Sequence, residues 1–99
     1  MALYTDQAVD EILKSLGYPD PMMAARQQGR MVLYGRLSRY QAAMQQLAHK
    51  WGKSLAEMQQ QYEQEGAEDF SADDDYAEWR WYDEAVQRIE AQLAALEAN

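Results

Sequence analysis

The sequence WRWYDEAVQRIEAQLAAL, residues 79–96, decides the fold of this chain. Its large apolar side chains are spaced alternately three and four residues apart: Trp79, Tyr82, Val86, Ile89, Leu93 and Leu96. That spacing is typical of the a and d positions of a helix that packs along a second helix. A complementary series occurs earlier in the chain: Leu33, Leu37, Tyr40, Met44, Leu47 and Trp51.

The two series predict an all-α fold built on an antiparallel helical hairpin, about residues 33–51 with 76–97. Pairing them end to end predicts six layers: Trp51 with Trp79, Leu47 with Tyr82, Met44 with Val86, Tyr40 with Ile89, Leu37 with Leu93, and Leu33 with Leu96. The same alignment places Lys50 beside Glu78. A fully buried large side chain contributes roughly 1.5–3 kcal/mol and an exposed ion pair only about 0–1 kcal/mol. We therefore expect the apolar layers to dominate stability.

Two further helices are expected beside the hairpin. Ser54 and Glu57 have the spacing of a capping box, which predicts a short connecting helix at residues 55–65. An N-terminal helix at residues 6–16 is predicted by an apolar stripe: Val9, Ile12, Leu13 and Leu16. Because so short a helix is marginal alone in water, it should pack on the hairpin or on a second copy.

The first hairpin helix is expected to begin at Pro21, with Asp20 as its N-cap. Gly29 and Gly35 would each cost roughly 1 kcal/mol in a helix interior. The sequence leaves open whether this helix is continuous from Pro21 or breaks between Gln28 and Gly35.

Length and composition point to one small helical domain, residues 1–99. The chain has no cysteine, which excludes disulfides and thiolate metal sites. No apolar run approaches the roughly 20 residues that cross a membrane. The first residues also lack the basic-then-apolar layout of a signal peptide. We therefore expect a cytoplasmic protein that does not contact a membrane.

The net charge of -8 is unevenly distributed. Residues 1–56 hold seven Lys/Arg and four Asp/Glu, whereas residues 57–99 hold two Lys/Arg and thirteen Asp/Glu, or +3 against -11. The acidic part favours a basic protein partner, although a solvated acidic surface has the same composition. It argues against binding nucleic acid over the whole surface.

No residue pattern predicts catalysis. The single histidine, His49, has no second imidazole for a metal site and no nucleophile nearby in sequence. Phosphate-binding, dinucleotide-binding and serine-hydrolase motifs are absent. We therefore expect a non-enzymatic protein with no cofactor and no metal.

Two groups of residues are candidates for binding. The first combines acids with a tryptophan expected to face outward, and we predict that it contacts a protein partner: Asp73, Asp74, Glu78 and Trp81. For Trp81 the alternative is packing beneath the third or the N-terminal helix, and for the acids it is helix capping. The second group is basic: Arg26, Arg30, Arg36 and Arg39. These arginines would contact phosphates in a nucleic-acid-binding protein, or pair with the acidic half of the same molecule or of a second copy.

Several short motifs follow one another from about residue 38 to residue 97. They are Arg39-Tyr40, Lys50-Trp51-Gly52-Lys53-Ser54-Leu55, Tyr62-Glu63, an acidic linker, and Asp75-Tyr76-Ala77-Glu78-Trp79. In this arrangement the chain resembles the small acidic helical proteins that are the antitoxin-like halves of bacterial toxin–antitoxin pairs. The resemblance implies a partner subunit that covers the basic, RNA-handling site of a small toxin.

Three functions therefore remain after the sequence alone. The first is a protein-interaction module, antitoxin-like, that binds and neutralises a basic, nuclease-type partner. The second is a self-associating structural protein, such as a homodimer, and the third is a nucleic-acid-binding module.

Overall fold

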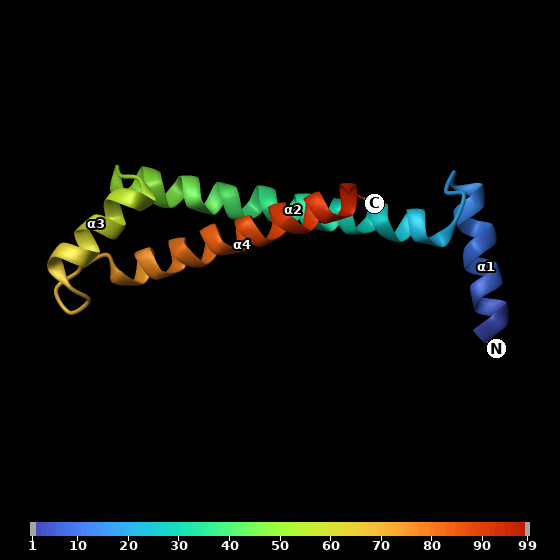
Figure 1. Cartoon of the computed structure of the whole chain (residues 1–99), viewed down its shortest axis with the longest axis horizontal. Helices are drawn as coiled ribbons and strands as arrows, with labels where there is room; N and C mark the ends of the chain where they lie inside the picture. The colour runs from blue at the N-terminus through green and yellow to red at the C-terminus, as the bar shows by residue number, and fades with distance from the viewer. Residues whose placement is uncertain (1, 99) are drawn as a thin grey trace.

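The computed structural model describes residues 2–98, and the side chains of residues 6–98. Within that range the chain is all-α, with four helices and no strand: α1 (Ala2–Ser15), α2 (Pro21–Trp51), α3 (Leu55–Glu65) and α4 (Asp73–Glu97). Helices α2 and α4 lie side by side as an antiparallel hairpin, and α3 closes one end of it (Figure 1). The predicted hairpin with an additional connecting helix and N-terminal helix is confirmed. No helix within residues 2–98 is long and apolar enough to cross a membrane.

Helix α2 is continuous over 31 residues. At its start the side chain of Asp20 accepts a hydrogen bond from the backbone N–H of Met23 at 2.8 Å, and Pro21 occupies the first turn. At its end Gly52 adopts a φ of 63°, and its N–H donates to the Ala48 carbonyl. The break considered near Gly29 does not occur, because this part of α2 packs on α4.

Gly35 offers a direct test of what a glycine costs in this helix. A Cβ added at Gly35 would meet no atom within 4 Å. We therefore expect Gly35→Ala to raise the free energy of unfolding by about 1 kcal/mol, through helix propensity alone. Urea unfolding followed by circular dichroism measures the change. Gly52→Ala is the control and should destabilise, because its positive φ disfavours a side chain; a destabilised Gly35→Ala would contradict the continuous helix.

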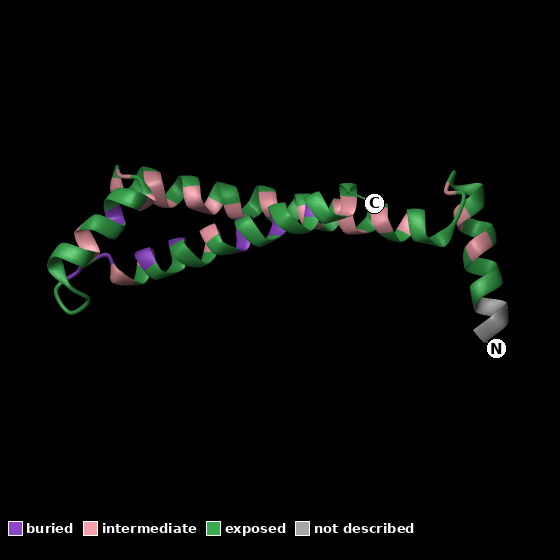
Figure 2. Cartoon of the chain, viewed as in Figure 1, coloured by how far each residue is buried: buried purple, intermediate pink, exposed green. Residues whose placement is uncertain are grey.

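The densest packing lies at the closed end of the hairpin. The capping box is present, since the Ser54 hydroxyl accepts from the Glu57 N–H while the Glu57 carboxylate accepts from the Ser54 N–H. This cap starts α3 so that Met58 points inward, where it is fully buried. The buried cluster around it comes from α3, the following loop and the first turns of α4: Met58, Phe70, Ala72, Tyr76 and Trp79. Figure 2 shows this buried region where α3 and the loop meet α4.

Along the rest of the hairpin only α4 has buried residues. They are Ala85, Val86, Ile89 and Leu93, with Trp79 at the closed end, whereas α2 has none. Helix α2 contacts α4 along one face and also contacts α1, and much of its remaining surface is exposed (Figure 2). The structure is therefore a narrow hairpin whose core is one seam wide.

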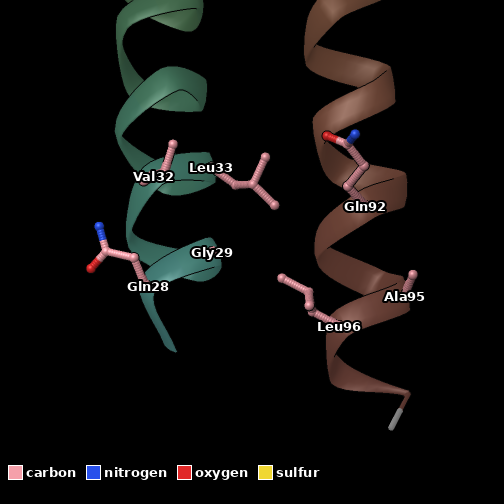
Figure 3. Close-up of a pocket in the computed structure, with 7 residues that line it drawn as sticks. All are labelled: Gln28, Gly29, Val32, Leu33, Gln92, Ala95 and Leu96. Carbon is pink, nitrogen blue, oxygen red and sulfur yellow. The ribbon is translucent and has the colours of Figure 1, made fainter. Parts of the chain in front are cut away.

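The alignment of α2 with α4 differs from the predicted one by about one helical turn. Lys50 Nζ lies 2.6 Å from Asp75 Oδ2, one turn away from the carboxylate predicted beside it. At the open end Gly29 faces Leu96, whose Cδ1 would lie 3.6 Å from a Cβ on that glycine, and Leu33 lies one turn further along (Figure 3). The predicted layers are therefore wrong in detail. In the observed alignment Leu96 packs closely on α2 at Gly29, which has no side chain.

Helix α1 lies at the end of the molecule opposite α3 and runs across the direction of the hairpin (Figure 1). It begins at Ala2, before the predicted start at residue 6. It contacts α2, but Val9, Ile12 and Leu16 of its apolar stripe remain exposed. The molecule measures 62 × 26 × 21 Å with a radius of gyration of 20.5 Å, against about 13 Å for a compact domain of this length.

Candidate interaction surfaces

The closed end of the hairpin is strongly acidic. Residues 57–84 hold eleven Asp/Glu and one Lys/Arg, for a net charge of -10. Among the described residues only Asp75 and Glu84 of this group form salt bridges, Asp75 with Lys50 and Glu84 with Arg80. The remaining nine carboxylates have no cationic partner there. We call this region, residues 57–84, the acidic end.

Asp75 fastens the end of α2 to the start of α4. Its Oδ2 accepts hydrogen bonds from Lys50 Nζ at 2.6 Å and from Trp51 Nε1 at 2.8 Å. The hydrogen bond from Lys50, followed by that from Trp51, holds the pKa of Asp75 below its ordinary value. Of the three consecutive acids, this one is therefore a structural contact, while no side chain caps the N-terminus of α4.

The lowered pKa makes a prediction about pH. A carboxylate with a depressed folded-state pKa contributes its stability in full above the unfolded pKa, about 3.9, and loses it as pH falls through the lower folded value. We expect Asp75→Asn to be less stable than the wild type at neutral pH, and the difference to shrink as pH falls below about 3.9. Urea unfolding at a series of pH values measures this. Asp74→Asn, which removes an exposed neighbour, is the control; a difference for Asp75→Asn that did not vary with pH would contradict the assignment.

The predicted partner-binding group is only partly brought together. Asp74, Glu78 and Trp81 are spaced four and three residues apart in α4, so they share one flank of it. Asp73, the first residue of α4, does not belong to this series of four- and three-residue spacings. Glu78 Oε1 accepts a hydrogen bond from the Tyr82 hydroxyl at 3.3 Å. Burial and the charge of Glu78 raise the pKa of Tyr82.

Trp81 is half-exposed, at 51%. Its ring meets Tyr40 edge-on, with centroids 5.4 Å apart, so it packs on α2 and not beneath α3 or α1 as considered above. Beside it lies a pocket of about 260 Å³ lined by Tyr40, Trp81, Arg36 and Arg88 together with Ala85, Ile89 and Gln92. Trp81 is therefore not surrounded by acids alone. Asp74 and Glu78 precede it on α4, whereas Arg36 and Arg88 line the pocket beside it.

The four predicted arginines do not form one surface. Arg26 and Arg30 share one face of α2, and Arg36 and Arg39 occupy another. No residue within 2–98 forms a salt bridge with any of the four, so the predicted pairing with the acidic half of the same molecule is wrong. Arg88, which sequence reasoning missed, joins Arg36 instead. The available signal was its position on α4, two turns after Trp81 and one turn before Gln92.

A second surface lies at the opposite end from the acidic end. Seven of the nine exposed large hydrophobic side chains in the described part of the chain gather there. They are Val9 and Ile12 of α1, Leu16 directly after it, and Met22, Met23, Met31 and Val32 of α2. We call these seven residues the apolar end. Beside it, Val32, Leu33, Ala95 and Leu96 line an open groove of about 600 Å³ between α2 and α4 (Figure 3).

The fold and these surfaces define an acidic helical-hairpin protein with an acidic end and an apolar end. Within residues 2–98 no group of three or more His, Asp and Glu residues is placed to hold a metal ion. Comparison of the chain with protein families, curated proteins and solved structures finds no match.

Proposed function

We propose that this chain is a non-enzymatic interaction protein that binds a basic protein through its acidic end. The observation that supports this most strongly is the concentration of charge at one end of a rod, with nine of eleven carboxylates free of salt bridges in the described chain. Such a surface steers and accelerates association with a positively charged partner. Binding through these nine carboxylates would leave the contacts of Asp75 with Lys50 and Trp51 intact.

The flank formed by Asp74, Glu78 and Trp81 is the proposed centre of the contact. A half-exposed tryptophan held against Tyr40 is already oriented, so binding orders it at little entropic cost. The two acids supply charge on the same side of α4. By its resemblance to antitoxin-like proteins, the proposed partner is a small basic toxin of nuclease type, whose RNA-handling surface the acidic end would cover.

The test uses the full chain immobilised and exposed to an extract of its source cells at low and at high salt. The retained protein is identified, purified and titrated against variants by calorimetry. We expect Asp74→Asn/Glu78→Gln/Trp81→Ala to weaken binding at least about 30-fold. The matched control, Glu11→Gln/Glu90→Gln/Tyr34→Ala, removes the same charge and one half-exposed aromatic elsewhere, and should bind as the wild type does. Retention of no basic protein, or equal binding by both variants, would refute the proposal.

A nucleic-acid-binding alternative has one observation in its favour. Arg36 and Arg88 lie with Tyr40 and Trp81 around one pocket, and cations beside aromatic rings are typical of single-strand binding. This alternative expects affinity that falls steeply with salt. A mobility-shift assay with single-stranded RNA at about 50 mM salt decides it, since the absence of a shift there would exclude it.

A further inference from the structure

We propose that the apolar end binds the apolar end of a second copy of this chain, so that two rods join with their acidic ends outermost. This goes beyond the proposed function, because it concerns a different surface and a different partner. In such a dimer the exposed apolar residues of α1 would pack against the second copy.

The surface area of the chain leaves room for such a contact. The accessible surface is 7369 Å², whereas a compact monomer of 11.5 kDa exposes about 5,800 Å². The excess is about 1,600 Å², and a stable interface buries about 800 Å² on each partner. The surplus belongs to the whole rod, and it exceeds the area that one such interface would bury on each copy.

The placement of the apolar side chains requires more than a single helix to cover them. Met22 and Met23 are adjacent in α2, as are Met31 and Val32, and adjacent residues of a helix do not share a face. A second copy brings both an α1 and an α2 with the same apolar residues, which suits a two-fold contact.

Charge favours a second copy over other occupants. Residues 1–36 contain four Lys/Arg and four Asp/Glu, so this part is neutral, while residues 37–99 contain five Lys/Arg and thirteen Asp/Glu. Two copies repel each other everywhere except at the neutral end. That end also has no net charge to attract a basic protein. Its acids Asp6, Asp10 and Glu11 on α1 disfavour an anionic membrane.

Sedimentation equilibrium of the full chain tests the proposal. We expect a dimer at about 10 µM protein, and at least about a 100-fold loss of the association constant in Ile12→Glu/Met31→Glu. Both side chains are exposed in the single chain, at 57% and 60%, so circular dichroism should confirm an unchanged helix content. The control Gln45→Glu/Gln46→Glu adds the same charge at exposed positions of α2 and should remain dimeric. A wild-type monomer at about 100 µM, or a dimer that the apolar-end variant leaves intact, would overturn the proposal.

A distance measurement fixes which ends meet. Because the chain has no cysteine, single cysteines at Gln27 and at Gln60 can carry spin labels in separate samples. Labels at Gln27 should lie close together in the dimer. Labels at Gln60, near the acidic end, should lie farther apart than the 62 Å length of one rod. The opposite order would show a dimer through the acidic ends and refute the assignment.

Discussion

Replacing Trp79 by alanine is expected to lower the free energy of unfolding by about 3–5 kcal/mol. The indole is only 3% exposed and belongs to the cluster at the closed end, against which Trp51 of α2 also packs. Its removal leaves a cavity where α2, α3 and α4 meet. This cluster is the densest packing of the molecule, so its side chains are held in place and relax only partly into that cavity. Urea unfolding at a fixed protein concentration measures the loss.

Trp81 provides the matched control for Trp79. It is the same residue type on the same helix, two positions away, but it is half-exposed and contacts Tyr40 edge-on. We expect Trp81→Ala to cost about 1 kcal/mol, the scale of an aromatic edge contact. Equal losses at the two positions would contradict the observed orientation of α4.

Met58→Ala is the second large effect, with an expected cost of about 2–5 kcal/mol. Met58 is the one buried residue of α3 and is wholly inaccessible to solvent. Without it, α3 keeps its capping box and the partly buried contacts of Leu55 and Tyr62, but loses its one buried side chain. We therefore expect faster hydrogen exchange in α3 as well as lower global stability.

The methionine control for this experiment lies at the other end of the molecule. Met31 is 60% exposed in the single chain, and Met31→Ala should change the stability of the fold by no more than about 0.5 kcal/mol. If Met58→Ala were as mild as Met31→Ala, α3 would not be packed as described. If Met31→Ala also weakened association, that would add support to the dimer and not to a role in the fold.

The two proposed surfaces lie at opposite ends of a rod 62 Å long. Variants of the apolar end should therefore leave the affinity for a basic partner unchanged, and variants of the Trp81 flank should leave the oligomeric state unchanged. The two proposals can fail separately, because energetic effects at distant sites without shared contacts add independently.

Features encoded over a few consecutive residues were predictable from the sequence. The capping box of Ser54 and Glu57 and the Asp20-Pro21 start of α2 each depend on local backbone geometry, and each was predicted correctly. The antiparallel hairpin also followed, because an alternating spacing of three and four residues leaves one apolar face that must be covered.

Features that depend on how two helices meet were not predictable in the same way. A heptad series repeats, so sliding one helix by a turn keeps apolar residues facing apolar residues. The observed alignment was selected by particular contacts: Asp75 with Lys50 and Trp51, and Leu96 against Gly29. The surroundings of Trp81 and the scattered arginines follow from that alignment.

The sequence by itself therefore determined the number of helices, the ends of α2 and α3, and the pairing of α2 with α4, because these depend on periodicity and local capping. Only the tertiary structure decided the alignment of the hairpin and left α1 exposed at the end opposite the acidic carboxylates. The physical reason is that the free energy of helix packing depends on the shape and polarity of side chains that are distant in sequence. A repeating apolar pattern does not distinguish between neighbouring turns.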